Sequence, residues 1–194
     1  MAGNGLIGKK VDRYEILEKI GEGGMASVYK AYDTRLEREV AIKFTKREAF
    51  PPDQLGMILK RFEREAKSLG RLSHPNIVGV IDYGEYDGAP YLVMTYLPGG
   101  TLKQKLGKPI PWREAVETII PIARALQYVH SHNIINRDVK PSNILLTENG
   151  EAMLTDFGLV KLFEGQDVSQ QLTDSGAGIG TPDYMAPEQW TGET

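Results

Sequence analysis

The stretch Asn136-Arg137-Asp138-Val139-Lys140-Pro141-Ser142-Asn143 decides how the rest of this sequence is interpreted. It places a carboxylate, an ammonium group and an amide within one short segment, just after an apolar run that predicts a helix. Further along, Asp156-Phe157-Gly158 adds a second carboxylate beside a glycine, at the end of a short predicted strand. Asn143 and Asp156 offer the hard oxygen ligands that Mg²⁺ prefers when it binds together with phosphates. Each segment taken alone is also compatible with a polar turn.

A glycine-rich segment, Gly21-Glu22-Gly23-Gly24-Met25-Ala26-Ser27-Val28, lies between two predicted strands. Glycine has no Cβ, so backbone amides at these positions can approach phosphate oxygens closely. An ordinary hairpin turn explains the same residues. The dinucleotide-binding alternative requires a helix directly after the glycines, whereas Ser27–Tyr32 has the pattern of a strand, so the sequence disfavours it.

A lysine ends the apolar strand Val40-Ala41-Ile42-Lys43, and by itself it is compatible with a solvated side chain. Apolar residues with helical spacing then predict an amphipathic helix; they are Ile58, Phe62, Ala66 and Leu69. Glu65 shares the apolar face of that helix, where a carboxylate is costly unless it is paired. We therefore expect Glu65 to pair with Lys43 and to hold its ammonium group against phosphates.

The elements predicted along the chain change from strands to helices. Strand patterns and one helix precede Pro98-Gly99-Gly100, which predicts a connector. Beyond it a helix is expected from Pro111 towards His132, kinked by Pro121. Its apolar side is predicted to consist of Val116, Ile119, Ala123, Leu126 and Val129. The sequence thus predicts an α+β fold, with a small antiparallel β lobe plus one helix followed by a mainly helical part.

Composition excludes several classes of protein. The 194 residues are 41% hydrophobic and 25% charged, as in ordinary globular domains, and they contain no cysteine for disulfides or thiolate metal sites. The net charge of −3 comes from interleaved acidic and basic residues, which argues against nucleic acid as the main partner. No apolar run approaches the roughly 20 residues of a membrane span. We expect a cytoplasmic protein, or the cytoplasmic face of a membrane protein if the gene continues into an anchor.

In this order and at these distances, the segments resemble the eukaryotic-type protein kinase family, from about Tyr14 to the last residue. Ala186-Pro187-Glu188 completes the set of matching motifs. The residues within and around these motifs look most like those of the bacterial Ser/Thr kinases. The resemblance implies a bilobal kinase-like fold. Residues 1–97 would form the N-lobe with the glycine loop and its helix, and residues 98–194 a partial C-lobe with the catalytic loop and activation segment.

The resemblance also implies ATP and Mg²⁺ as cofactors, with Mn²⁺ as an alternative metal. Asn143 and Asp156 would hold the metal, and Lys43, braced by Glu65, would grip the α- and β-phosphates. Gly21, Gly23 and Gly24 would cover the phosphates, and Val28, Ala41 and Leu145 would enclose the adenine. The hinge would include Thr95 and Leu97, directly after the gatekeeper Met94.

Asp138 would accept the proton of the substrate hydroxyl, and Lys140 would neutralise the γ-phosphate, as in Ser/Thr rather than Tyr kinases. Arg137 resembles the arginine that receives an activation-loop phosphate, for which the candidate regulatory positions are Thr173, Ser175 and Thr181. The implied reaction transfers the γ-phosphate of ATP to Ser/Thr hydroxyls of proteins. Self-association for autophosphorylation is a further expectation.

Three departures from the family pattern stand out. Ala26 replaces the third glycine of the loop, and Asn136 stands where the family usually has histidine or tyrosine. A buried amide must find partners, because each unsatisfied polar group costs about 1–3 kcal/mol. The chain ends at Thr194, soon after Glu188, whereas the family continues for several helices. We therefore expect the isolated chain to be poorly stable or to aggregate, unless another segment covers its exposed apolar helix face.

Two alternative functions stay open. Asn136 and the missing helices favour a pseudokinase-like module that binds nucleotide or partners without efficient transfer. Against it, the charged residues that the chemistry requires are all present, among them Lys43, Asp138 and Asp156. An unrelated nucleotide-binding enzyme is the third interpretation, and the complete order of the motifs argues against it.

Overall fold

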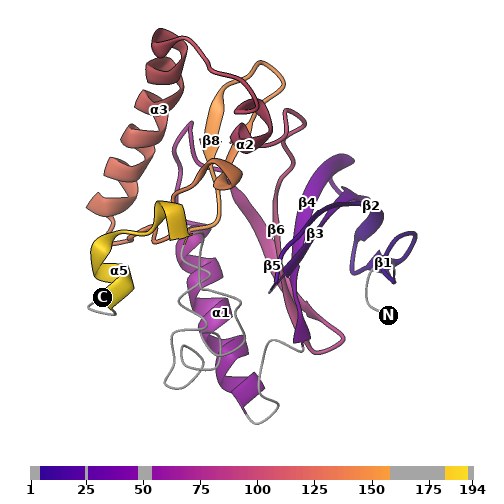
Figure 1. The fold of residues 1–194 in the computed structure, drawn as a ribbon. Helices are drawn as coiled ribbons and strands as arrows, with labels where there is room; N and C mark the ends of the chain where they lie inside the picture. Colours follow the sequence, from indigo (N-terminus) through magenta and orange to yellow (C-terminus); the bar gives the residue numbers. More distant parts are fainter. Residues whose placement is uncertain (1–4, 25, 48–53, 158–181, 192–194) are drawn as a thin grey trace. The chain divides into compact units, whose positions relative to one another are not determined.

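The computed structural model describes residues 5–24, 26–47, 54–157 and 182–191, and the chain divides into two compact units. The first unit consists of Met1–Ser73 and Val78–Leu97, and the second of His74–Ile77 and Pro98–Thr194. Figure 1 labels most of the strands and helices of both units. The α+β fold class predicted from the sequence is confirmed: the strands form an antiparallel sheet in the first unit, and the longest helix belongs to the second.

The first unit is built on a six-stranded sheet in the order β1-β2-β3-β4-β6-β5, in which every neighbouring pair is antiparallel. The strands are β1 (Lys10–Val11), β2 (Tyr14–Glu22), β3 (Ala26–Asp33), β4 (Arg38–Thr45), β5 (Val80–Tyr86) and β6 (Ala89–Thr95). Alternate side chains of a strand point to opposite faces, so one face of this sheet gathers the core. That core includes Tyr14, Ile16, Tyr29, Ala31, Val40, Ile42, Phe44, Tyr91 and Val93.

A two-residue turn joins β5 to β6. Asp87 and Gly88 have φ angles of 53° and 75°, the left-handed pair that suits the twist of a hairpin. β5 begins at Val80, so Ile77 is not part of this strand. Ile77 instead forms an isolated parallel bridge with Leu154, inside the second unit.

The helix of the first unit, α1 (Leu55–Leu69), buries the stripe that its sequence predicts: Ile58, Phe62, Ala66 and Leu69. It packs against β5 and β6. The helix ends at Gly70, whose N–H donates to the carbonyl of Ala66 at 2.8 Å. Burial of one apolar stripe against the sheet is what stabilises a helix of this length.

The second unit combines helices with a two-stranded ladder. Its elements are α2 (Leu102–Lys105), α3 (Trp112–Ser131), the 3-10 turn η3 (Pro141–Asn143), β7 (Ile144–Leu146), β8 (Ala152–Leu154), the 3-10 turn η5 (Pro182–Tyr184) and α5 (Pro187–Thr191). Thr101 and Gln104 form a capping box at the start of α2. Helix α3 runs through Pro121 and packs against β8.

The apolar side predicted for α3 differs from the side that packs within the unit. The buried residues of α3 are Ile122, Ala125 and Val129, so only Val129 belongs to both sets. Five residues of α3 share an exposed stripe, which we call the outer face: Trp112, Val116, Ile119, Ile120 and Ala123. Because α3 has apolar residues on two sides, their spacing does not predict which side packs against β8. Despite this stripe, no helix within the described ranges has the length and hydropathy needed to cross a bilayer.

Candidate active site

Asp138 lies at the centre of a short loop of the second unit, residues 136–143, which we call the Asp138 loop. The backbone N–H of Asp138 donates to Oδ1 of Asn136 at 3.0 Å. Nδ2 of Asn143 donates both to the Asp138 carbonyl and to its Oδ2, each at 2.8 Å. The Lys140 ammonium lies 2.7 Å from the same Oδ2, in a partly buried ion pair. Three neighbours therefore hold the backbone and the carboxylate of Asp138.

The two candidate metal ligands lie on adjoining stretches of backbone. Because Nδ2 of Asn143 is committed to Asp138, Oδ1 is the atom that this amide can offer to a cation. The carbonyl of Asn143 accepts a hydrogen bond from the N–H of Thr155 at 3.0 Å, and Asp156 follows directly. Asp156 has a φ of 61°, a left-handed conformation that aspartate tolerates better than most residues. The donor set, one amide oxygen and one carboxylate, suits Mg²⁺.

Asn136 contributes a hydrogen bond that sequence reasoning missed. Its side chain is buried, with the residue 3% exposed, and Nδ2 has no hydrogen-bond partner within the described part of the chain. Oδ1, however, accepts from Asp138 in the pattern of an Asx turn. The sequence contains the signal for this bond, since asparagine commonly accepts a hydrogen bond from the backbone N–H two residues later.

Helix α5 reaches the Asp138 loop through Gln189, a second residue that sequence reasoning missed. Nε2 of Gln189 donates to the Arg137 carbonyl at 2.9 Å, and its Oε1 accepts from the N–H of Ala186 at 3.0 Å. The first contact joins residues 52 positions apart. No local pattern predicts such a pair, because a glutamine in a short polar helix usually meets solvent.

In the first unit, four of the predicted nucleotide-binding residues share the sheet face opposite the aromatic core; they are Val28, Ala41, Lys43 and Met94. Lys43 on β4 lies across from Val28 on β3, and Ala41 lies across from Met94 on β6. Ala41 and Met94 are buried, whereas Val28 and Lys43 are half-buried. Strand alternation places Ile42 on the other face, in the core. One face of the sheet therefore carries a lysine between small and apolar side chains.

The glycine loop joins β2 to β3 in a compact turn, in which the N–H of Gly23 donates to the Ala26 carbonyl at 2.8 Å. None of its three glycines, Gly21, Gly23 and Gly24, has a positive φ. A Cβ added at Gly21 would meet Val28 at 3.5 Å, an ordinary contact, and one at Gly24 would meet no atom within 4 Å. In the described residues the fold itself does not demand glycine here, which leaves close approach of a ligand to the backbone as a reason for it.

Glu65 lies half-buried on α1, next to Ala66. Among the ion pairs of the described residues in the first unit, none joins Glu65 to Lys43, so the pair stays a prediction. At the predicted hinge, the N–H of Thr95 donates to the Gly79 carbonyl at 3.0 Å, and Leu97 is half-buried.

The remaining predicted positions fall in the second unit. Leu145 is half-buried on β7, opposite Met153 of β8. The predicted regulatory residues Thr173, Ser175 and Thr181 lie outside the described residues.

Comparison with known proteins gives the same family from three directions. A family model described as "Protein kinase domain" matches residues 14–193. The probable serine/threonine-protein kinase PknB of Lactococcus lactis is 43% identical over 184 residues, covering 93% of this chain and 28% of the relative. The serine/threonine-protein kinase PrkC of Bacillus subtilis is 40% identical over 190 residues, covering 96% and 28%. The chain thus spans between a quarter and a third of these relatives.

Solved structures agree with these relatives. The structure titled "PpkA-294 apo form" matches with a TM-score of 0.75 and 28% identity, over 95% of this chain and 70% of that one. The Mycobacterium tuberculosis PknI kinase domain matches with a TM-score of 0.68 and 29% identity, over 78% and 61%. With the motifs, the Asp138 loop and these matches together, the chain belongs to the protein kinase family.

Proposed function

We propose that this protein transfers the γ-phosphate of ATP to Ser/Thr hydroxyl groups of proteins, its own chain included. The observation that carries the proposal is the Asp138 loop, where a carboxylate, an ammonium group and an amide are held together by hydrogen bonds. The named relatives are Ser/Thr kinases but extend well beyond this chain. Activity, substrates and a place on the cytoplasmic side of the cell are therefore proposals for the whole protein.

In the proposed mechanism, the Asp138 carboxylate orients the substrate hydroxyl and accepts its proton as the oxygen attacks phosphorus. The Lys140 ammonium, already beside Asp138, balances negative charge on the group being transferred. Because Asn143 holds the carbonyl and the carboxylate of Asp138, the base is oriented before the substrate binds. Catalysis of this kind depends on positioning and electrostatic stabilisation more than on covalent chemistry.

Oδ1 of Asn143 and the Asp156 carboxylate would hold Mg²⁺, or Mn²⁺ in its place. When bound, the metal supplies positive charge to the phosphate oxygens. Lys43, with Glu65 as its brace, would bind the α- and β-phosphates beneath Gly21, Gly23 and Gly24. The absence of any conformational demand for glycine at these three positions supports that role.

Adenine would lie against Val28, Ala41 and Leu145, with Met94 as the gatekeeper. Since the N–H of Thr95 is committed to Gly79, Thr95 would offer its carbonyl to the base, and the backbone of Leu97 would supply the donor. Arg137 would receive a phosphate placed on Thr173, Ser175 or Thr181.

A phosphoryl-transfer assay with γ-labelled ATP and a generic basic protein substrate tests the proposal. We expect label on the protein substrate and on the chain, both lost in Asp138→Asn. Transfer that persists in Asp138→Asn would contradict the assigned base. Equal labelling without Mg²⁺ or Mn²⁺ would contradict the assigned metal ligands.

Nδ2 of Asn136 has no partner among the described residues, which favours a second candidate, a pseudokinase-like module that binds nucleotide without efficient transfer. Nucleotide binding measured by calorimetry separates the two. ATP binding with no transfer in either the natural protein or Asp138→Asn supports the binding module, whereas transfer lost only in the variant supports the enzyme.

A further inference from the structure

Lys30 on β3 belongs to the sheet face that we assign to the nucleotide, because it alternates with Tyr29 and Ala31 of the core. Its partner on β4 is Ala41, which is proposed to lie against the adenine, and Ala41 is also the partner of Met94 on β6. Lys30 therefore lies in the same row of the sheet as Ala41 and Met94, beside the surface proposed for the base.

The side chain of Lys30 extends from this row towards the end of β6. Its ammonium nitrogen lies 4.8 Å from the centroid of the Tyr96 ring, which is the geometry of a cation–π contact. The same nitrogen lies 2.7 Å from Oε1 of Glu39 on β4. Glu39 precedes Ala41 by two residues, so it is the diagonal neighbour of Lys30 on this face, a separation that a long side chain can bridge. The ammonium group thus contacts a ring and a carboxylate.

The Lys30 ammonium is charged and partly shielded from water. The side chain of Lys30 is 19% exposed, whereas that of Glu39 is 48% exposed. The hydrogen bond from Lys30 to Glu39 outweighs the effect of burial and raises the pKa of the ammonium group above its ordinary value of 10.5. Cation–π contacts strengthen as the cation loses water. The half-buried ring of Tyr96 therefore meets a permanent cation at neutral pH.

Tyr96 lies in the segment that is expected to recognise the base. The ladder between β4 and β6 ends at the pair Val40 and Thr95, so Tyr96 follows the last paired residue directly. In the proposed function, Thr95 and Leu97 on either side of it offer their backbone groups to adenine. A contact that fixes the side chain of Tyr96 restricts the backbone on both sides, and a binding site ordered in advance loses less entropy when its ligand arrives.

We propose that Lys30 is a positioning residue for nucleotide recognition, which holds Tyr96 through the cation–π contact and so orders the hinge backbone for adenine. This inference rests on the proposed function, because it requires ATP to bind along the hinge. Lys30 acts on the base and not on the transferred phosphate, so its loss should weaken ATP binding and preserve the chemical step. The ion pair with Glu39 is the smaller contribution, since exposed ion pairs stabilise little.

Substitutions at both ends of the contact test the proposal through KM and kcat for ATP. Lys30→Met keeps an unbranched side chain without the charge, and Tyr96→Leu removes the ring. Each should raise KM for ATP about 3- to 10-fold, the range that a cation–π contact covers, and should change kcat less than about twofold. The double variant should raise KM no more than either single variant, because the two substitutions remove the same contact.

Conservative variants provide the rescue. Lys30→Arg keeps a cation and Tyr96→Phe keeps a ring, so both should retain nearly the natural KM. Glu39→Gln should change KM less than about twofold. If KM in Lys30→Arg and Tyr96→Phe rises as much as in Lys30→Met, the proposal is overturned, because packing alone would then explain the loss. Where circular dichroism shows that Lys30→Met does not fold, the pair Tyr96→Leu and Tyr96→Phe makes the same comparison.

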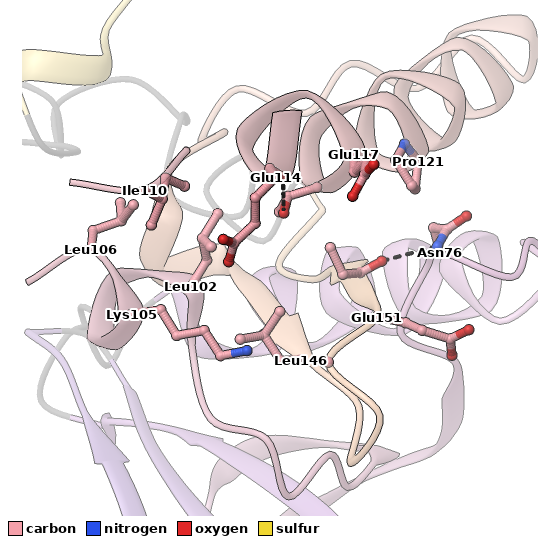
Figure 2. A pocket seen from close by; sticks show the side chains of 13 residues that line it. Asn76, Leu102, Lys105, Leu106, Ile110, Glu114, Glu117, Pro121, Leu146 and Glu151 are labelled. Carbon is pink, nitrogen blue, oxygen red and sulfur yellow. Dashed lines mark hydrogen bonds between the residues drawn. The ribbon is translucent and has the colours of Figure 1, made fainter. Parts of the chain in front are cut away.

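Lys105→Met is the matched control, since it makes the same chemical change in the second unit. There Lys105 lines a pocket of about 350 Å³ together with Leu102 and Glu151 (Figure 2). Within the described ranges, no ion pair or cation–π contact involves Lys105. The control should leave KM for ATP within about twofold of the natural value. An equal rise of KM in Lys30→Met and Lys105→Met would overturn the proposal by showing a general effect of charge.

Calorimetric titration with ATP and Mg²⁺ separates this inference from the proposed function. ATP binding without transfer in the natural protein would contradict the proposed function, and the Kd values of the same variants would then replace KM in every comparison. Transfer with equal KM in the natural protein and Lys30→Met would overturn the role of Lys30 and leave the proposed function standing. A natural protein that binds no ATP would overturn both.

Discussion

Oδ1 of Asn136 accepts a hydrogen bond from the backbone N–H of Asp138 at 3.0 Å, while Nδ2 of the same buried amide has no partner in the described residues. Oδ1 therefore helps to shape the loop, whereas the unsatisfied Nδ2 lowers the stability of the fold. An unsatisfied buried donor costs about 1–3 kcal/mol, and a hydrogen bond of this kind contributes about 1 kcal/mol. The natural residue is a compromise between loop geometry and stability.

Asn136→Ala should lower activity, because it leaves the Asp138 N–H without its acceptor, whereas stability should change less, because the unsatisfied Nδ2 is removed at the same time. Asn136→Ser should retain more activity, since a serine hydroxyl can accept in the same local turn. We expect kcat to fall more than KM rises, because the bond orients the proposed base. Urea unfolding and steady-state kinetics measure the two effects. Asn149→Ala, at an exposed turn, is the control and should change the unfolding free energy by less than about 0.5 kcal/mol.

Asn143→Ala should impair phosphoryl transfer and metal use together. The variant loses both hydrogen bonds to Asp138 and the proposed metal ligand at once. We expect kcat/KM to fall about 10- to 100-fold, as for partners that orient metal ligands, and the Mg²⁺ concentration for half-maximal rate to rise. Rates measured across a Mg²⁺ titration check this. A lower rate with an unchanged Mg²⁺ requirement would remove Asn143 from the metal site and leave it as an anchor of Asp138.

The stability of the first unit should depend on the ionisation of Asp33. Its fully buried carboxylate accepts from the N–H groups of Arg35 and Leu36 and pairs with the Arg13 guanidinium at 3.1 Å. Burial alone would raise the pKa of Asp33, but the hydrogen bonds from Leu36, Arg35 and Arg13 outweigh it and hold the pKa below its ordinary value of 3.8. A lowered folded-state pKa stabilises the fold above the unfolded-state pKa, and that contribution is lost as the pH falls through the folded-state value.

Asp33→Asn should therefore lower the unfolding free energy at pH 7 by about 1–3 kcal/mol, the cost of weakening a buried charged hydrogen-bond network. The difference between the natural protein and the variant should shrink as the pH falls from about 4, the unfolded-state pKa of aspartate, through the lowered folded-state pKa of Asp33. Urea titrations at a series of pH values measure this difference. Asp87→Asn, at an exposed turn, should change the unfolding free energy at pH 7 by less than about 0.5 kcal/mol.

Gly99→Ala should destabilise the second unit far more than Gly107→Ala. A Cβ at Gly99 would lie 2.5 Å from the carbonyl oxygens of both Leu146 and Thr147, which are backbone atoms and cannot move aside cheaply. We expect a loss of about 1–3 kcal/mol, typical of overpacking. Gly107 has no atom within 4 Å of such a Cβ. Thermal melting of the two variants compares them, and equal melting temperatures would contradict the close packing of Gly99 on β7.

The outer face of α3 should promote self-association of the isolated chain. Ile119 and Ile120 are 50% and 45% exposed, and Trp112 is 71% exposed. Contiguous exposed apolar side chains favour association. Ile119→Lys with Ile120→Glu should raise solubility and shift sedimentation towards the monomer without lowering the melting temperature. A natural chain that sediments as a monomer and melts cooperatively would contradict this expectation.

Local sequence patterns predicted the helix and strands in which each face has one environment, either buried or outside the core. Helix α1 has one apolar stripe and buries it, and the strands of the first unit alternate between core and opposite face as expected. The β7–β8 hairpin brings the backbone segments of Asn143 and Asp156 together, and their role as metal ligands stays a prediction.

Patterns failed where long-range contacts decide the outcome. Helix α3 is apolar on two sides, and the side that contains Ile122 and Ala125 is the buried one, in a helix that packs against β8. Gln189 contacts Arg137 across 52 residues of sequence. The sequence predicted a free-energy cost for a buried Asn136, but Oδ1 of its amide accepts a hydrogen bond from the Asp138 N–H. In each case the missing information was the neighbour in space.

The contacts of Asp138 with Asn136, Lys140 and Asn143 are all short-range in the chain. Closing such small loops costs little chain entropy, so the geometry around the carboxylate can form early and locally during folding. Binding of a substrate hydroxyl to this rigid acceptor would then cost the protein little conformational entropy. Amide hydrogen exchange should accordingly find the Asp138 N–H among the slower-exchanging loop amides even without nucleotide.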